Sequence, residues 1–447
     1  MTNLFIFRRD LRLEDNKGLL RALKTGQDII PIFIFDTKQR SHDYFSYNSF
    51  EFMINSLKEL DSELKAKGSK LYLFDGIPQE IVLRIIKEFN IKKVFVNEDY
   101  TPFSKKRDVY LKKICEDQKC DFVSCFDLLL QRPGSVLKDN GEPYTVFTPF
   151  YNKALEFDVL TPEKNEFKNY FKEDISFSIS FDDVLDFESN PNLAVKGGRK
   201  EAFKLLEEAK NIHDYSKDRN FPNIKGTTML SAHHKFGTLS IRESYWYIKQ
   251  EIGSEALIRE LYWRDFYTNI AYFFPEVFGN NFKRKYDVIN WNENEELFKK
   301  WCEGKTGFPI VDAGMRELNK TGYMHNRVRM IVSSFLTKNL LIDWRKGEKY
   351  FASKLTDYDP CVNNGSWQWA ASTGCDAQPY FRIFNPWSQG EKFDKDTKYI
   401  KKWVLELKEL EPKIIHEIYK HEVEGYPDPI IDYKESRSIA LEEFKKA

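Results

Sequence analysis

The chain has 447 residues, of which 41% are hydrophobic and 31% are charged. This length exceeds that of most single domains, so we expect two or three domains with a large buried core. Lys plus Arg and Asp plus Glu each number 69. The resulting zero net charge does not by itself indicate a nucleic-acid partner, which would need basic residues gathered on one face. No apolar run approaches the roughly 18 residues needed to span a bilayer, and the N-terminus lacks the order of a signal peptide, which predicts a cytoplasmic protein.

Short apolar runs alternate with amphipathic segments in the first part of the chain. The runs are typical of buried strands in a parallel sheet and read LFIF, DIIPIFIFD, KLYLFDG, KKVFVNED and DFVSCFD. Helical patterns between them cover residues 16–24, 45–67, 78–90 and 103–118. These repeats predict a doubly wound, five-stranded, Rossmann-like α/β domain over residues 1–128. No GxGxxG motif follows the first strand, so ordinary dinucleotide binding is not expected there.

Polar residues follow several of these strands at their carboxyl ends, where doubly wound sheets bind ligands. The group comprises Arg8, Arg9, Asp10, Asp36, Asn97 and Glu98. They are candidates for a ligand site. The alternative, that they are solvated loop residues and helix caps, stays open.

The cysteines and histidines do not show the spacing of a disulfide framework or a metal site. The six cysteines include no CxxC pair. We interpret the evenly spaced Cys115, Cys120 and Cys125 as small buried hydrophobic residues. No second His, Cys or acidic cluster lies at ligand spacing from His325, so no metal is expected.

The composition changes after residue 128. Residues 129–196 are rich in turn formers and then in Asp, Glu and Ser, without a long helical period, which predicts a linker across the surface. The pattern over residues 197–447 is helical and predicts an all-α domain. Its candidate helices cover residues 198–210, 238–250, 254–272, 294–303, 309–320, 326–341 and 397–408.

Two segments of the helical region carry candidate binding groups. Residues 226–231 read GTTMLS and precede an apolar helix, so their hydroxyls and backbone amides could cradle a phosphate, although Thr and Ser are also common helix caps. Glu260, Trp263 and Arg264 are spaced three and four apart and would share one helix face. That face could be a pocket wall or carry a surface Glu–Arg pair.

A third candidate segment reads GYMHNRVRM. Its Arg327 and Arg329 are two residues apart and therefore point to different sides of a helix. One of them could face an internal ligand while the other faces a phosphate outside.

The stretch from Asp357 to Pro386 combines carboxylates, paired asparagines and tryptophans. Burying such polar groups without partners costs a few kcal/mol each, so a plain structural core would avoid them. The mixture predicts a lined cavity in which rings surround a ligand and polar groups orient it. The alternative is a Gly-interrupted loop packed on a helical core.

Several long segments resemble the DNA photolyase and cryptochrome family. They read GYMHNRVRM, LLIDWRKGEKYF, NNGSWQWAASTG and FRIFNPWSQGEKFD. The resemblance extends over nearly the whole chain and is best to the class I cyclobutane pyrimidine dimer (CPD) photolyases. It implies an α/β antenna domain and a helical FAD-binding catalytic domain. It also implies light-dependent repair of UV-damaged DNA, by electron transfer from excited reduced FAD to a flipped-out dimer.

The resemblance also implies which residues contact the cofactor. Asp357 and Arg329 would pair beside the isoalloxazine, and Asn363 would face flavin N5, where an amide has no acidic proton to give. The remaining residues expected at FAD are Tyr215, Thr227, Thr228, Leu230, Ser231 and Asp359. Electrons would pass from the surface to the photoexcited flavin along Trp291, Trp344 and Trp367.

The lesion contacts follow from the same resemblance. Glu260 and Asn326 would hydrogen-bond the base edges of the dimer, and the side chains of Trp263, Met330 and Trp369 would enclose it. Four arginines would face the phosphates of the damaged strand, namely Arg219, Arg264, Arg327 and Arg382. We expect a monomer without membrane contact, associated with the nucleoid when it is bound to DNA.

The chain departs from the family pattern at two positions near the cofactor. Tyr323 replaces the usual Trp of GWMHN, and Met229 stands where Arg is common, so FAD affinity could differ. Plant cryptochromes carry Asp where this chain has Asn363, which favours repair.

Other functions and a second cofactor stay open. The alternatives are a cryptochrome photoreceptor, a (6-4) photolyase, and a flavin oxidoreductase that works in the dark. The antenna domain could bind folate, an 8-hydroxy-deazaflavin or a second flavin (FMN or FAD), or it could be empty. No long tail follows residue 447, so we expect no signalling extension.

Overall fold

The computed structural model of the chain describes residues 2–447, so residue 1 of the expected antenna domain lies outside it. By backbone packing the described chain divides into two compact units, and both are discontinuous in sequence. Unit 1 comprises the chain up to Ser189, Val195–Lys210 and Met229–Pro275. Unit 2 comprises Asn190–Ala194, Asn211–Thr228 and Glu276–Ala447. This division differs from the sequence-based boundaries at residues 128 and 196.

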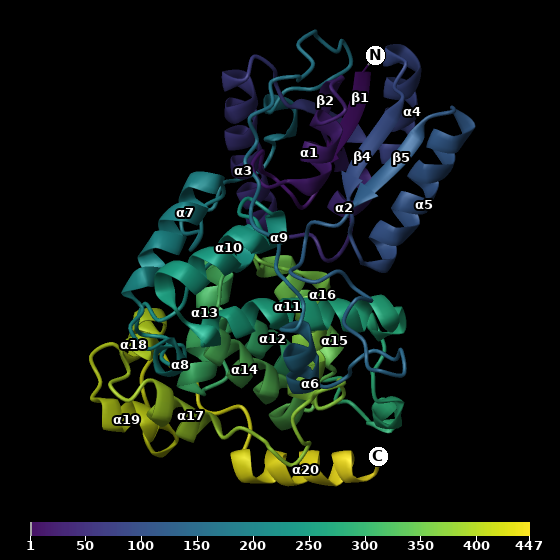
Figure 1. Cartoon of the computed structure of the whole chain (residues 1–447). Coiled ribbons are helices and arrows are strands. Elements are labelled where there is room, and N and C mark those ends of the chain that lie inside the picture. Colours follow the sequence, from purple (N-terminus) through teal and green to yellow (C-terminus); the bar gives the residue numbers. More distant parts are fainter. Residues whose placement is uncertain (1) are drawn as a thin grey trace. The chain divides into compact units, whose positions relative to one another are not determined.

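Unit 1 contains a five-stranded sheet whose neighbouring strands are all parallel, in the order β3-β2-β1-β4-β5 (Figure 1). The crossover order and the helices between the strands confirm the predicted doubly wound α/β fold. The strands are β1 (Thr2–Phe7), β2 (Asp28–Asp36), β3 (Tyr72–Gly76), β4 (Lys93–Asn97) and β5 (Asp121–Cys125). The connecting helices are α1 (Lys17–Leu23), α2 (Thr37–Arg40), α3 (Tyr47–Ala66), α4 (Pro78–Phe89) and α5 (Pro102–Asp117).

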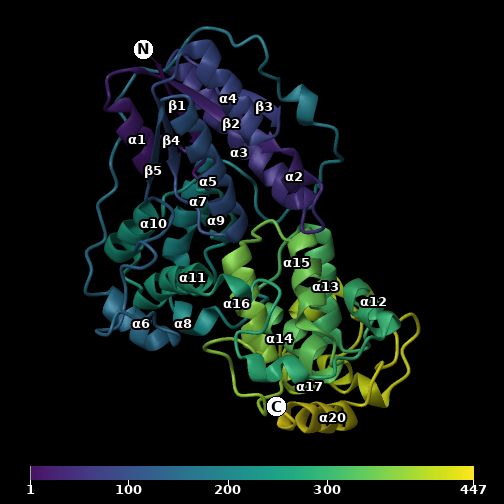
Figure 2. The ribbon, with the colours of Figure 1, turned by 90° about the vertical axis from the view of Figure 1, so that its right-hand side faces the viewer.

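Both faces of the sheet are covered by helices, which explains why its strands are apolar without interruption. Alternate residues of a strand point to opposite faces. Phe5 and Phe7 of β1 pack with α1 and α3, whereas Leu4 and Ile6 pack with α4 and α5. Figure 2 shows these helical layers from a second direction.

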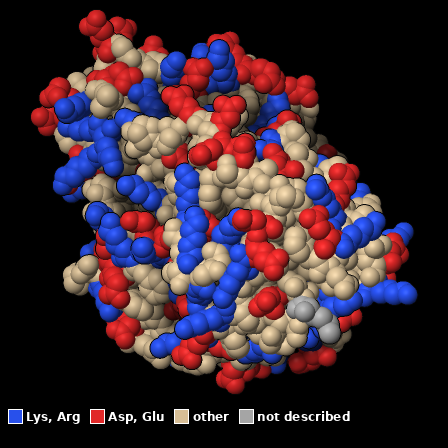
Figure 3. Space-filling view, turned by 90° about the horizontal axis from the view of Figure 1, so that it is seen from above, with Lys and Arg blue, Asp and Glu red and all other residues tan. Residues whose placement is uncertain are grey.

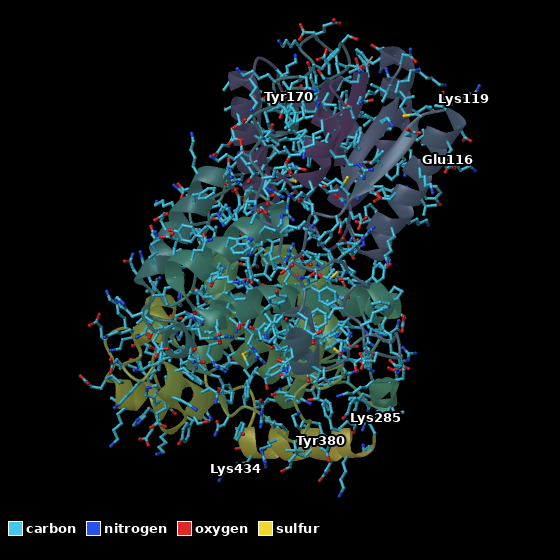
Figure 4. All side chains as sticks on the ribbon, viewed as in Figure 1. Glu116, Lys119, Tyr170, Lys285, Tyr380 and Lys434 are labelled. Atoms are coloured by element: carbon cyan, nitrogen blue, oxygen red, sulfur yellow. The ribbon has the colours of Figure 1, made fainter. Side chains whose placement is uncertain are left out.

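The segment predicted as a linker is attached to this sheet by its backbone. Phe171 donates from its backbone N to Ile29 O over 2.9 Å, and Ile179 forms an isolated bridge with Leu73. Tyr170 is fully buried and is labelled among the side chains of the sheet region in Figure 4. The segment also contains a helix that the sequence did not predict, α6 (Phe147–Ala154), and a short 3-10 turn, η1 (Asp182–Val184).

The remainder of unit 1 is helical. The longest helix of this remaining part, α11 (Glu255–Phe273), agrees closely with the prediction for residues 254–272. The predicted helix over 238–250 divides into α10 (Ile241–Tyr247) and the π-helix η3 (Ile248–Ile252). The other elements are α7 (Arg199–Glu208), η2 (Ala209–Asn211), α9 (Ser231–Phe236) and the start of the 3-10 turn η4 (Pro275–Val277).

A buried network of charged residues links α10 to the sheet within unit 1. Arg242 of α10 contacts Asp15 and Asp127 at 2.8 and 2.6 Å, and Arg12 contacts Asp127 at 2.6 Å. All four side chains are at most 3% exposed. Burial raises the pKa of Asp127, but the two arginines together outweigh burial. They lower this pKa to about 2.

Unit 2 is all-helical around one large core, as predicted. Its helices are α8 (Tyr215–Asp218), α12 (Glu295–Glu303), α13 (Pro309–Thr321), α14 (Asn326–Ser334), α15 (Trp344–Lys354), α16 (Pro360–Ala371), α17 (Pro386–Phe393), α18 (Lys398–Trp403), α19 (Pro412–His416) and α20 (Tyr433–Lys445). The shorter elements are the 3-10 turns η5 (Arg284–Val288), η7 (Leu405–Leu407) and η8 (Ile418–Lys420) and the π-helix η6 (Phe335–Asn339).

Two predicted helices of unit 2 end differently from the prediction. The predicted helix over 326–341 is α-helical only to Ser334 and continues as the π-helix η6. The predicted helix over 397–408 ends at Trp403 and is followed by a 3-10 turn. Among residues 2–447, no helix is both long enough and apolar enough to cross a membrane.

Candidate functional site

The expected ion pair between Arg329 and Asp357 is present in unit 2. Arg329 Nη2 lies 2.9 Å from Asp357 Oδ2, and Arg329 Nε donates to Met324 O over 2.7 Å. The Asp357 side chain is 6% exposed. Burial lowers the pKa of Arg329, but the groups around it, Asp357 foremost, together raise that pKa above its usual value. The pair thus presents a permanent cation at the start of α14.

Tyr323 lies beside this pair. Its ring centroid is 5.4 Å from Arg329 Cζ. Burial raises the pKa of Tyr323 to about 12, so it is a neutral phenol at physiological pH. Tyr323 and the Arg329–Asp357 pair therefore lie together in unit 2.

The other expected phosphate-contacting residues are divided between the two units. Tyr215 begins α8 in unit 2, with its ring 5.3 Å from Arg219 Cζ. Leu230 and Ser231 lie in unit 1 at the start of α9. Met229 has a backbone φ of 56°, in the left-handed region that a side chain disfavours.

The charges of three arginines act on His325 in unit 2. His325 caps the N-terminus of α14, where its ring accepts from Arg327 N over 3.2 Å. Burial, and then the charges of Arg329, Arg327 and Arg219, lower the pKa of His325 to about 4. Burial and the charge of Arg219 also lower the pKa of Arg327. A phosphate bound here would relieve this repulsion.

Asn326 and Met330 are one turn apart on α14. Arg327 lies between them in sequence, donates to Asn220, and lies 3.7 Å from the Met330 sulfur. Arg382 is exposed in the segment between α16 and α17. On the face that Figure 3 presents, acidic and basic side chains are interspersed.

The stretch opened by Asp357 forms α16, which the sequence analysis did not predict as a helix. Asp359 caps it by accepting from Cys361 N over 3.1 Å. Asn363 and Trp367 are four residues apart and share one face of α16. Asn363 Nδ2 lies 3.4 Å from Glu348 O, which fixes the amide against α15.

The three expected electron-transfer tryptophans lie in one unit. Trp367 packs directly on Gly347, where an added Cβ would lie 2.2 Å from the indole. Gly347 is one turn from Trp344, whose Nε1 donates to Asn281 Oδ1 over 2.8 Å. Asn292, next to Trp291, donates to Leu341 O over 2.7 Å, three residues before Trp344. The segments that carry Trp291, Trp344 and Trp367 therefore contact one another in unit 2.

The sequence analysis did not identify two residues that pack around Trp367. Trp301 lies 6.2 Å from Trp367 between ring centroids and is fully buried. Gly347 leaves the space that Trp367 fills. Sequence spacing carries no signal for either, because both contacts join different helices.

The expected lesion residues of unit 1 lie on α11. Trp263 is stacked on Phe147, with ring centroids 3.6 Å apart. The guanidinium of Arg264 donates to Leu128 O over 2.6 Å and to His234 O over 3.0 Å. These bonds direct Arg264 toward the backbone of its own unit, whereas a phosphate contact was expected for it.

Three of the polar residues at the strand ends, Arg8, Asp10 and Asn97, contact one another. Asn97 Nδ2 donates to Asp10 over 2.5 Å and to Asn16 over 2.7 Å. Burial raises the pKa of Asp10 to about 6. Asp36 caps α2, which is the capping alternative left open above. Residues 2–447 contain no group of three or more His, Cys, Asp or Glu that could hold a metal ion.

Comparison with known proteins identifies the family. The family model for DNA photolyase matches residues 3–167, and the model for the FAD binding domain of DNA photolyase matches residues 257–446. The deoxyribodipyrimidine photo-lyase of Alkalihalophilus pseudofirmus is 37% identical, covering 98% of this chain and 97% of that protein. The crystal structure of an archaeal photolyase from Sulfolobus tokodaii, with two FAD molecules, is 47% identical, covers 100% of both chains and has a TM-score of 0.93.

A cryptochrome is more distant. The structure of the Synechocystis cryptochrome is 28% identical, covers 99% of this chain and 98% of that chain, and has a TM-score of 0.87. The chain belongs to the photolyase and cryptochrome family. It is an enzyme of the photo-lyase type, with that family's FAD-binding domain in its C-terminal part.

Proposed function

We propose that the protein repairs cyclobutane pyrimidine dimers in UV-damaged DNA in a light-dependent reaction. The observation that carries this proposal is the Arg329–Asp357 pair, in a chain whose full length is similar to photo-lyases. A fixed guanidinium favours the anionic, reduced form of a nearby flavin by Coulomb attraction, which is strong in a pocket that excludes water.

The donor groups of unit 2 fit FAD. Thr227 supplies a hydroxyl, and the mutual repulsion of Arg219 and Arg327 is the electrostatic condition that a pyrophosphate relieves. Reduced FAD, when bound and excited by light, supplies the electron that opens the dimer and receives it back. Asn363 would hydrogen-bond flavin N5 without offering it an acidic proton, because an amide does not ionise at physiological pH.

The tryptophans would keep the cofactor reduced. Trp367 would donate an electron to the photoexcited, oxidised cofactor, and Trp344 would then reduce the oxidised Trp367. Trp291 would be the member of the path nearest the surface. The buried, packed positions of Trp344 and Trp367 support this order, because Trp291 alone of the three is partly exposed.

The dimer would be recognised by side chains that each helix presents. Glu260 and Asn326 would hydrogen-bond the base edges, while Trp263 and Trp369 would stack on the extruded bases. Trp367 is buried whereas Trp369, two residues later, is partly exposed. This difference agrees with a division of α16 between electron transfer and lesion contact.

The sheet region would bind a second flavin as an antenna. The support is the similarity to the Sulfolobus tokodaii photolyase, whose structure holds two FAD molecules. Extraction and chromatography of the cofactors of the purified protein test this proposal. Two equivalents of flavin per chain are expected, and one equivalent with a pterin or with nothing else would contradict it.

One assay distinguishes the proposed function from its alternatives. Reduced protein is incubated with an oligonucleotide that contains a CPD, in blue light and in darkness, and restored thymines are counted. We expect repair in light only. Repair in neither condition would favour a cryptochrome photoreceptor, and a dark redox activity would favour an ordinary flavin oxidoreductase.

A further inference from the structure

Phe147, the first residue of α6, stacks face to face on Trp263 of α11. The ring planes are 7° from parallel at a centroid distance of 3.6 Å. Phe147 is 1% exposed, and Phe266 meets it edge-on at 5.7 Å. An indole has two faces, so a base can stack on Trp263 only at the face opposite Phe147.

Arg259 supports Phe147 from the same helix that carries Trp263. Its Cζ lies 4.9 Å from the Phe147 centroid and 5.0 Å from that of Tyr151. Its Nη2 donates to Thr148 Oγ1 over 3.2 Å. Residues 259 and 263 are neighbours along one helix face, so the Phe147 ring contacts a guanidinium and an indole that are one turn apart.

The position of α6 is set by aromatic contacts with α11. Phe150 meets Phe266 at 5.5 Å, and Tyr151 meets Tyr262 at 5.3 Å. The first turn of α6 has no side-chain cap. These ring contacts therefore hold α6 against α11, the helix that carries Trp263.

We propose that Phe147 is a positioning residue for lesion recognition, which holds the Trp263 indole in the orientation that stacks on an extruded pyrimidine dimer. This rests on the proposed function, in which Trp263 contacts the dimer. Without the Phe147 ring the indole regains rotational freedom, and ordering it again weakens binding. Undamaged duplex DNA keeps its bases stacked and is bound through phosphates, so its affinity does not depend on Phe147.

The test compares substitutions in the FAD-loaded protein. Phe147→Leu keeps most of the apolar volume and removes the flat ring, whereas Phe147→Tyr keeps the ring. For Phe147→Leu we expect an about two- to tenfold weaker Kd for a CPD oligonucleotide, the range that a stacked aromatic pair provides, with the Kd for undamaged DNA unchanged. Phe147→Tyr restores the dimer affinity, and the repair yield at saturating substrate stays near wild type in both.

A matched control separates positioning from packing. Phe150→Leu removes a ring that is also 1% exposed on the same helix but contacts Phe266. It should lower the Tm without a selective loss of dimer affinity. If Phe147→Leu does not load FAD, Phe147→Met, which also lacks a ring, replaces it.

A spectroscopic readout follows the stack without DNA. With 5-fluorotryptophan incorporated, the Trp263 resonance is assigned as the signal missing in Trp263→Phe. Loss of the Phe147 ring current shifts this resonance in Phe147→Leu, and Phe147→Tyr leaves it nearly in place. An unshifted resonance, or an unchanged dimer Kd in Phe147→Leu, overturns the proposal.

Failure of this proposal is distinguishable from failure of the proposed function. If Trp263→Ala weakens dimer binding and Phe147→Leu does not, the result contradicts only the positioning role of Phe147. If Trp263→Ala leaves dimer affinity unchanged, the result contradicts both the lesion contact of Trp263 and the positioning role of Phe147.

Discussion

Asp357 is the residue whose loss should affect the cofactor region most directly. Asp357→Asn keeps the size of the side chain but leaves the partly buried Arg329 charge uncompensated. We expect a loss of about 1–3 kcal/mol in the free energy of unfolding, less than for a fully buried pair because Arg329 is partly solvated. FAD retention should fall as well. Chemical denaturation of the cofactor-free protein and flavin titration measure the two effects.

A matched control is available on α15. Asp343 pairs with Arg345 at 3.0 Å, with side chains 26% and 31% exposed, and it also caps its helix. Asp343→Asn keeps the cap, since Asn caps helices well, and should cost less than about 0.5 kcal/mol. Equal losses for Asp343→Asn and Asp357→Asn would contradict a special role for the Arg329 pair.

Glu348 should make stability depend on pH. Burial raises its pKa from 4.5 to about 7, although Asn364 donates to it over 3.1 Å. Above its unfolded pKa the unfolded state loses this proton while the folded state keeps it, so stability falls as pH rises from about 4.5 through 7. Glu348→Gln removes this penalty. We expect it to match wild type near pH 4 and to be more stable at pH 8, by on the order of 3 kcal/mol.

Denaturation midpoints of both proteins across this pH range check the prediction. A constant difference between wild type and Glu348→Gln would show that Glu348 has the same pKa in the folded and the unfolded state. It would contradict the pKa shift.

At the scale of elements, α10 depends on the buried charges around Arg242. Arg242→Met leaves Asp15 and Asp127 with one guanidinium between them in a site that excludes water. Removing one member of such a network typically costs about 3–5 kcal/mol. The exposed pair Lys24–Glu163 gives the control, because Lys24→Met should cost less than about 1 kcal/mol. Thermal unfolding that ranked the two substitutions equally would contradict this difference.

The contact of α15 with α16 leads to a prediction for the electron path. Trp344→Phe keeps a ring in the core but interrupts the path between Trp291 and Trp367. We expect flavin photoreduction by an external thiol to slow tenfold or more, while a chemically reduced sample still repairs dimers. Trp301→Phe is the control, because it makes the same Trp-to-Phe change at another tryptophan beside Trp367. If it slows photoreduction as much as Trp344→Phe does, the main path runs through Trp301 instead.

The sequence predicted some elements well and missed others for physical reasons. The strands of the sheet are buried on both faces and so appear as uninterrupted apolar runs. By contrast, α16 combines Asn, Gly and Trp without an apolar stripe, because polar side chains such as Asn364 and Gln368 are buried with hydrogen-bond partners. Its polar composition indicated a cavity and hid the helix.

For the whole molecule, the family resemblance predicted the Arg329–Asp357 pair, which the structure contains, but not the residues that pack against the tryptophans. Gly347, Trp301 and Phe147 act by contacts between segments distant in sequence, which no local pattern records. The zero net charge likewise concealed the local cluster of arginines around His325.

We expect light-dependent repair of CPDs to be the activity of the whole protein. The most direct measurement is the initial rate of thymine restoration by the reduced, FAD-loaded protein, under blue light and in darkness, on matched oligonucleotides carrying either a CPD or a (6-4) photoproduct. We expect restoration of the CPD in light only and none of the (6-4) photoproduct. Light-dependent restoration of the (6-4) photoproduct alone, or no restoration of either lesion, would contradict the account.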